Sequence, residues 1–330
     1  MGSKFHVETY SEDFAKEWDQ FVLTDAINGT ILQTRRFLAY HPKERFEDCS
    51  LIVRKGNSIV AAVPACVQDN CGYKIFSSHA GSTFGGLIVN KRVLAAANAI
   101  DVVQLINKWL NENDFKKAVM KQTPNFFASE NVASVEYALQ HEGYLPYGEL
   151  SFVANLGDYD DNVESKFTSP RRRDCRYGQK AGCIFKELKF DNEVEQFYEI
   201  LKLSLQKFDA KPVHTLEELL DFKNSRLRDE VRFYGVEFAG ELIAGCMVFL
   251  FGSSVFHTQY LAANPDYLDV FPMNYMDWNL IKTAKKLGFP KFSFGISTEE
   301  HGHVLNSSLA TFKEGFGGTH SMNWTFTKEL

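Results

Sequence analysis

The sequence predicts a mixed α/β protein in which one structural unit occurs twice. Each half begins with two β-rich runs around a tight turn, in residues 51–67 and in residues 234–250. A segment with helical spacing of apolar residues follows in each half, and then an extended run. Each half closes with a helix, a turn with an acidic residue, a glycine and an aromatic residue, and a last strand. This alternation after an early hairpin favours mixed sheets over an all-parallel sheet or a sandwich.

The two early hairpins correspond in position and pattern. Their turns are centred on Gly56-Asn57 and on Ala239-Gly240. When the two segments are aligned, residues 59–62 fall on residues 242–245, with apolar residues at matching offsets. The match indicates a repeated unit and not two unrelated hairpins.

The later elements of the two halves also correspond. In the first half, residues 102–111 have helical spacing and residues 117–122 are extended. In the second half, we expect a helix over residues 275–286 that ends at Gly288, and a strand over residues 291–294. The closing turns are residues 141–144 and 313–316, and the last strands are residues 150–154 and 323–327.

An acidic, turn-rich stretch at residues 157–162 separates the two units. We therefore predict an N-terminal domain over residues 1–156 and a C-terminal domain over residues 157–330. The second domain begins with additional helices, which are expected at residues 163–181, 194–208 and 216–227.

Composition excludes several classes of protein. The net charge of -6 and the pI near 5.9 argue against a protein that binds DNA or anionic lipid over its whole surface. No apolar run is long enough to span a bilayer, and no secretion signal opens the chain, so we expect a cytoplasmic protein. The six cysteines have no metal-ligand spacing, which indicates reduced thiols and no metal site.

The last third of the chain resembles a known family. Tyr260 ends a strand, Pro272 precedes a helix, and a later strand ends at Phe294-Gly295. The sequence then continues with the pattern Phe-Lys-x-x-Phe-Gly over residues 312–317. These features are similar to the second subdomain of FemAB-like proteins, which include the peptidoglycan-bridge aminoacyltransferases. The resemblance implies two tandem acetyltransferase-type (GNAT) subdomains and transfer of an acyl or aminoacyl group to an amine.

The resemblance also implies partners. The acceptor is expected to be a small molecule or glycan precursor, such as a cell-wall, polysaccharide or nucleotide-sugar substrate. The donor is expected to be aminoacyl-tRNA or an acyl-CoA, with no tightly bound cofactor. One departure concerns CoA: residues 267–275 contain no glycine, and Pro272 lacks an N–H, so the usual pyrophosphate loop is missing. Two alternatives therefore stay open, a non-catalytic glycan- or nucleotide-sugar-binding scaffold and an acetyl-CoA-dependent N-acetyltransferase.

Lys313 and His257 are the candidate catalytic residues. The family pattern has a lysine at the position of Lys313, and a fixed cation there could stabilise the oxyanion of acyl transfer. The alternative is a solvated lysine at a helix end. His257 lies on the expected strand that ends at Tyr260, where it could act as a general acid or base or have only a structural role.

Other side chains are candidate substrate-binding residues. On the strand of His257, Gln259 is expected on the same face as His257 and Tyr260 on the other. Phe312 could line the acceptor groove or pack in the core. Three arginines in the segment 169–186 could bind phosphate, or could simply be an exposed basic helix face; they are Arg172, Arg173 and Arg176.

Overall fold

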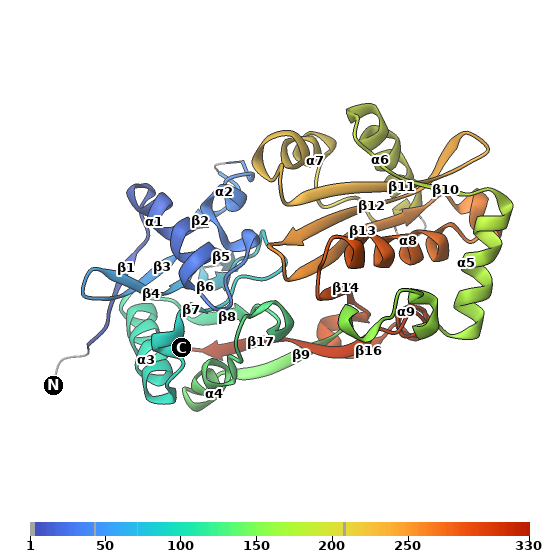
Figure 1. Cartoon of the computed structure of the whole chain (residues 1–330). Helices are drawn as coiled ribbons and strands as arrows, with labels where there is room; N and C mark the ends of the chain where they lie inside the picture. Colours follow the sequence, from blue (N-terminus) through green and yellow to red (C-terminus); the bar gives the residue numbers. More distant parts are fainter. Residues whose placement is uncertain (1–3, 43, 71, 207–208) are drawn as a thin grey trace. The chain divides into compact units, whose positions relative to one another are not determined.

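Figure 1 shows the computed structural model, which describes all residues except 1–3, 43, 71 and 207–208. The chain forms two compact units, which are described one at a time. Unit 1 comprises Met1–Glu149, Glu300–His303 and Ser321–Leu330, and unit 2 comprises Leu150–Glu299 and Val304–His320. The sequence predicted a single boundary after residue 156. In the structure, the C-terminal residues Ser321–Leu330, which include most of the last strand, belong to the first unit.

Unit 1 contains two groups of paired strands. The first is a sheet in the order β1-β3-β4-β7, formed by His6–Thr9, Leu51–Lys55, Ser58–Val63 and Ile88–Val89. In the second group the order is β17-β8-β6-β5-β2, and only β6 and β8 are parallel. Its strands are Thr319–Glu329, Lys117–Lys121, Tyr73–Ser78, Cys66–Asn70 and Glu47–Asp48. The predicted hairpin at Gly56-Asn57 is confirmed as β3–β4.

Helices cover the strands of unit 1. The longest, α3 (Ala96–Glu112), buries Val103, Ile106 and Leu110, the apolar residues whose spacing predicted it. These side chains belong to the apolar core of the unit, together with Phe76 from β6. The other α-helices are α1 (Ala15–Gln20), α2 (Arg35–Leu38) and α4 (Ala133–His141).

Unit 2 contains a mixed sheet in the order β10-β11-β12-β13-β14-β9. Its strands are Ile184–Glu187, Val231–Phe238, Glu241–Phe251, Val255–Ala263, Lys291–Ile296 and Leu145–Asn155. The hairpin predicted at Ala239-Gly240 is confirmed as β11–β12, and both turn residues have positive φ (51° and 85°). The parallel pair β13–β14 is short, because its pairing stops at His257↔Ser293.

Two helices pack on opposite faces of the unit 2 sheet. One face of β12 is covered by α6 (Asp191–Gln206), whose Phe197 lies so close to Gly245 that a Cβ at this glycine would be 2.1 Å from the Phe197 ring. The other face is covered by α8 (Pro272–Lys286), whose Met276 and Ile281 share a core with Cys246 and Val248. Both helices were predicted from apolar spacing.

Some predicted helices of unit 2 have different limits. The helix expected over 163–181 is interrupted, because Phe167 and Thr168 are extended between η7 (Val163–Lys166) and α5 (Ser169–Ala181). The helix expected over 216–227 divides into α7 (Leu216–Asp221) and the π-helical turn η8 (Phe222–Arg226). The last two residues of the helix expected over 194–208 lie outside the described residues. Unit 2 also contains η6 (Leu156–Asp158), η9 (Pro265–Val270) and α9 (Ser307–Glu314).

Two features bear on the expectations from composition. The described cysteines, Cys49, Cys66, Cys175, Cys183 and Cys246, are buried and form no disulfide, while Cys71 lies outside the described residues. In the described part of the chain, no helix combines the length and the apolar character that crossing a membrane requires.

Candidate active site

Lys313 is a buried lysine in the last turn of α9. Only 6% of its surface is exposed, so the solvated helix-end lysine that the sequence left open is excluded. Its Nζ donates hydrogen bonds to two backbone carbonyls of β14, at 3.1 Å from the Gly295 oxygen and 2.6 Å from the Ile296 oxygen. An ammonium group has three N–H donors, and the described residues provide no hydrogen-bond acceptor for the third.

The local course of β14 presents these carbonyls to Lys313. After His257↔Ser293, β14 no longer pairs with β13, and its pairing with β9 shifts by one residue between Ser293 and Gly295. Gly295 has φ of +74°, which favours glycine and turns the backbone away from regular strand geometry. The glycine of the Phe294-Gly295 motif therefore has a physical reason to be there.

Asp277 is a buried acid that sequence reasoning missed. It lies on α8, is 1% exposed, and receives no hydrogen bond on either carboxylate oxygen from the described residues. Burial raises the pKa of Asp277 to about 7, against the opposing charges of Lys313 and Arg171. The signal was present, because Asp277 lies four residues from both Met273 and Ile281 on an otherwise apolar helix face.

The lysine and the acid influence each other. Burial lowers the pKa of Lys313 to about 8, and the charge of Asp277 opposes this shift. Both groups therefore titrate near neutral pH, far from their ordinary ranges. Strongly perturbed groups of this kind concentrate at functional sites.

His257 is near enough to Lys313 to be influenced by its charge. Its Nδ1 is 3.0 Å from the Ser293 hydroxyl oxygen. Burial lowers the pKa of His257 to about 4; a hydrogen bond with the Gln259 side chain opposes this shift, and the charge of Lys313 adds to it. The imidazole is therefore neutral at physiological pH.

A β-bulge changes the expected alternation on β13. Met247 pairs with Tyr260 and Val248 pairs with Thr258, so Gln259 is an extra residue. The expectation that His257 and Tyr260 lie on opposite faces is therefore wrong, because the bulge places them on the same face. A bulge depends on the neighbouring strand and leaves no clear signal in a single sequence.

Tyr260 is engaged within unit 2. Its hydroxyl is 2.6 Å from Nδ1 of the buried His214. Burial raises the pKa of Tyr260 to about 12, so the phenol stays protonated. His214 was not predicted as a partner, because it lies 46 residues away along the chain.

Phe312 packs against the core of unit 2. The Arg171 guanidinium lies 4.6 Å from the centre of the Phe312 ring, and the centres of the Phe312 and Phe316 rings are 5.2 Å apart. Arg171 therefore connects α5 to α9 through a cation–π contact. This packing is compatible with the core role that the sequence allowed for Phe312.

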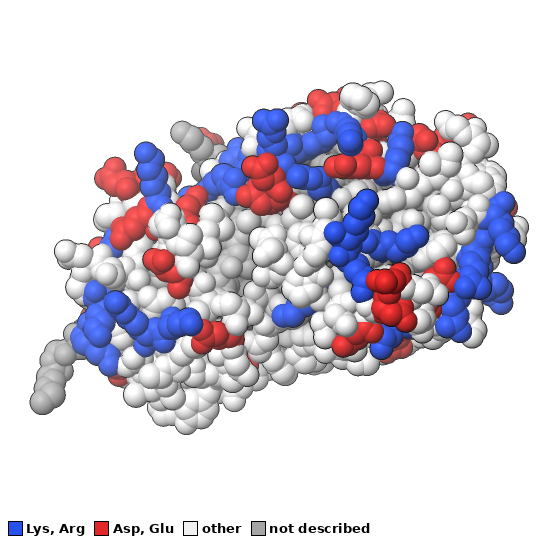
Figure 2. All heavy atoms as spheres, in the orientation of Figure 1, with Lys and Arg blue, Asp and Glu red and all other residues white. Residues whose placement is uncertain are grey.

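The three predicted phosphate-binding arginines lie on α5, and Figure 2 shows basic side chains over this helix. They are already engaged within unit 2. Arg176 forms a 2.7 Å ion pair with the buried Glu164, and Arg173 pairs with Asp174 at 3.0 Å. Arg172 donates to the Ser169 hydroxyl. These contacts favour the structural alternative that the sequence offered for the helix.

The N-terminus of α8 is covered by other parts of unit 2. The centre of the Phe271 ring lies 5.5 Å from the centre of the Tyr177 ring of α5. The Cys175 thiol, also on α5, donates a hydrogen bond to the Asn274 carbonyl. Pro272 and Asn274 are buried. The first turn of α8 therefore offers little open backbone N–H surface for a pyrophosphate. Among the described residues, no group of three or more His, Cys, Asp or Glu side chains could hold a metal ion.

We predict that Asp277→Asn changes how stability depends on pH. The folded-state pKa of Asp277 is raised, so its protonated form favours folding, and the wild type loses stability as pH rises from about 4 to about 7. By linkage, the wild type loses at most about 4 kcal/mol of its free energy of unfolding over this range. Asp277→Asn also removes the charge that favours protonated Lys313, and this reduces the stability that the variant gains. Urea unfolding across this pH range should show a flatter profile for Asp277→Asn. The exposed Asp269→Asn serves as control, and parallel curves for all three proteins would contradict the prediction.

Comparisons with known proteins agree with this architecture. Residues 166–302 match the family model of an acetyltransferase (GNAT) domain. Among solved structures, FemX has a TM-score of 0.73 at 12% identity, with 98% of this chain and 97% of FemX covered. The C-terminal domain (DUF2156) of a putative lysylphosphatidylglycerol synthetase from Agrobacterium fabrum has a TM-score of 0.63 at 10% identity, with 96% and 92% covered.

A tandem GNAT protein from the clavulanic acid biosynthesis pathway has a TM-score of 0.56 at 11% identity, with 98% of each chain covered. No curated protein matches this chain in sequence. The structural matches have low identity and therefore establish the fold alone, while the family model matches less than half of the chain. Residues 166–302 are thus similar to GNAT acetyltransferase domains, and the chain has the fold of tandem GNAT proteins, as the sequence resemblance predicted.

Proposed function

We propose that this protein transfers an acyl or aminoacyl group to an amine of a cell-wall, polysaccharide or nucleotide-sugar substrate. One observation carries the proposal: the buried ammonium group of Lys313 is held by two backbone carbonyls and keeps one N–H donor free of protein acceptors among the described residues. A cation fixed in this way suits the stabilisation of a developing negative charge.

The chemistry follows from this geometry. A neutral acceptor amine attacks the carbonyl carbon of the donor ester or thioester, and the carbonyl oxygen becomes an oxyanion. The remaining N–H of Lys313 donates to this oxyanion, while the Gly295 and Ile296 carbonyls keep the ammonium group in place. The amine gives up a proton to a base, the intermediate collapses, and the same proton passes to the leaving oxygen or sulfur, so that the donor departs as an alcohol or thiol. Because the donor N–H is fixed before the reaction, little reorganisation is needed.

His257 is the proposed acceptor of the amine proton. Its imidazole is neutral at physiological pH because burial lowers its pKa to about 4, so it is available as a base. Its ring position is supported by the Ser293 hydroxyl at 3.0 Å. His257 does not titrate near neutral pH, so a rate change near pH 8 would report Lys313 and not His257.

Two considerations favour an aminoacyl donor such as aminoacyl-tRNA over acyl-CoA. The first turn of α8 is covered by α5, which leaves little room for the pyrophosphate of CoA. FemX and the C-terminal domain of a protein titled a putative lysylphosphatidylglycerol synthetase share the fold. The donor would act as a substrate and not as a tightly bound cofactor. A scaffold without activity would have no use for a buried cation whose desolvation is costly.

We expect Lys313→Met to remove most transferase activity without unfolding the protein. Loss of one oxyanion donor typically costs about 100- to 1000-fold in turnover, and methionine fills the buried site with a similar length. The activity of the wild type should fall as pH rises through about 8, because Lys313 then loses its charge. Turnover and melting temperature are measured for both proteins.

His141→Ala is the matched control, because His141 occupies the corresponding position in unit 1 and its side chain is 45% exposed. It should retain wild-type turnover. If the rate instead rises through pH 8, Lys313 acts as a neutral base, and if Lys313→Met retains full activity the lysine is not catalytic. Activity lost only in His141→Ala would move the site to unit 1.

Acetyl-CoA should bind weakly or not at all, because the α8 N-terminus is covered and has no glycine loop. Isothermal titration calorimetry measures this directly, with a short-chain aminoacyl-RNA conjugate as the comparison ligand. A low-micromolar dissociation constant for acetyl-CoA, about -8 kcal/mol, would favour the N-acetyltransferase alternative.

A further inference from the structure

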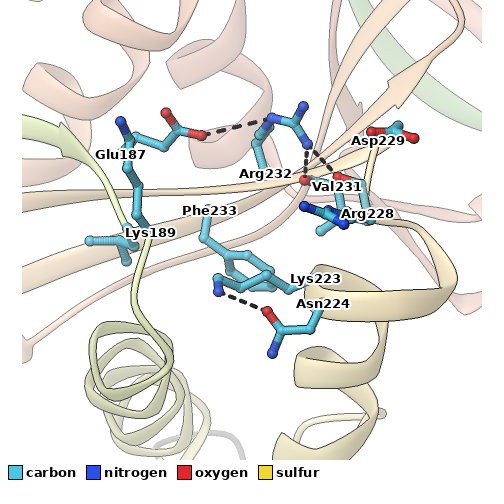
Figure 3. A pocket seen from close by; sticks show the side chains of 10 residues that line it. Glu187, Lys189, Lys223, Asn224, Arg228, Asp229, Val231, Arg232 and Phe233 are labelled. Carbon is cyan, nitrogen blue, oxygen red and sulfur yellow. Dashed lines mark hydrogen bonds and ion pairs between the residues drawn. The ribbon is translucent and has the colours of Figure 1, made fainter.

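Unit 2 has a concave site whose lining residues do not include Lys313 or His257. It is a basin of about 730 Å³ at the outer edge of the sheet, where β10, η8 and β11 come together. Figure 3 shows the side chains around it: Glu187, Lys189, Lys223, Asn224, Arg228 and Arg232. None of them was singled out by the sequence analysis.

The basin is basic in a protein with a net negative charge. Its lining includes four basic side chains and two acidic ones. Arg232 lies 3.7 Å from Glu187, and Lys223 pairs with Asp191 at 2.8 Å. Lys189 and Arg228 are exposed and have no acidic partner among the described residues. Two cations of the basin are therefore available to an anionic ligand.

Two backbone carbonyls hold the guanidinium group of Arg232 in a fixed orientation. Nη1 of Arg232 donates to the Arg228 carbonyl at 2.8 Å and to the Val231 carbonyl at 2.7 Å, as Figure 3 shows. These bonds fix the plane of the guanidinium group before any ligand arrives. A planar, oriented guanidinium matches the oxygens of a phosphate group better than a mobile ammonium does.

The π-helical turn η8 is an independent indication that the basin is a functional site. It inserts an extra residue into the helix that supplies Lys223 and Asn224 to the basin. Turns of this kind are uncommon and are frequent at functional sites. The Lys223 ammonium also contacts the Asn224 side chain at 3.0 Å, so the two polar groups face the basin together.

We propose that this basin binds the phosphate groups of a nucleotide or of an RNA strand. The inference rests on the proposed function, because the proposed aminoacyl-tRNA donor and nucleotide-sugar acceptor both carry such phosphates. It is tested by binding without turnover, so its failure is distinct from a failure of catalysis by Lys313. Arginine and lysine together provide both bidentate and point-charge contacts to phosphate, and the open shape leaves space for a chain of phosphates.

The test compares two probes on the full chain. A short labelled RNA hairpin is measured by fluorescence anisotropy at low salt, and a nucleoside diphosphate by calorimetry. Lys189→Ala combined with Arg228→Ala should weaken binding about tenfold or more and lower the salt slope by about 2 for RNA. Lys282→Ala combined with Lys286→Ala removes the same charge from exposed positions of unit 2 outside the basin, and should bind as the wild type.

The outcomes separate the sources of phosphate. Binding of RNA alone identifies a nucleic-acid backbone, and binding of the diphosphate identifies a nucleotide. The proposal is overturned if the wild type binds neither probe, or if the basin variant binds as the control variant does. Melting temperatures confirm that both variants fold, and Arg228→Gln replaces the double variant if it does not.

Discussion

The burial of one ammonium group determines the structure of the candidate site. Placing a cation inside a protein is costly unless hydrogen bonds replace its water, and Lys313 is therefore bonded to two carbonyls of β14. Those carbonyls are available only because β13 and β14 stop pairing at His257↔Ser293 and because Gly295 departs from regular strand geometry. The short parallel pair, the glycine and the lysine thus form one arrangement.

The second consequence of this burial is electrostatic. Asp277 carries the opposite charge in the same apolar surroundings, and each group opposes the pKa shift that burial causes in the other. The protonation of the pair therefore belongs to both residues together. Such coupling lets a site hold a cation at neutral pH, while a small rise in pH neutralises it. His257 stays neutral throughout this range, because burial lowers its pKa to about 4.

Local patterns in the sequence predicted much of the fold. Both hairpins and the helices α3, α6 and α8 follow from turn residues and from apolar spacing, which act within a few residues. The Phe312-Lys313 motif also identified Lys313 as a candidate catalytic residue. The surroundings of the lysine could not be predicted, because its burial and its carbonyl partners depend on segments that are distant in sequence.

The same limit explains the other differences. The bulge at Gln259 arises from pairing with β12, and Glu164 neutralises Arg176 across a break between two helices. Asp277 alone left a readable signal, as an acid within an apolar stripe. Helical spacing shows that such a residue is buried, but it does not show which charge lies beside it. Distinguishing the basic face of α5 from a binding surface likewise required the positions of its acidic partners.

The central claim is that Lys313 is a buried cation whose charge is set by its surroundings and by Asp277. Nuclear magnetic resonance of the protein with labelled lysines measures this directly, with Lys313→Met used to assign the signal. The account predicts that Lys313 titrates near pH 8 and at a lower pH in Asp277→Asn. Titration near the ordinary value of 10.5, unchanged by Asp277→Asn, would contradict it.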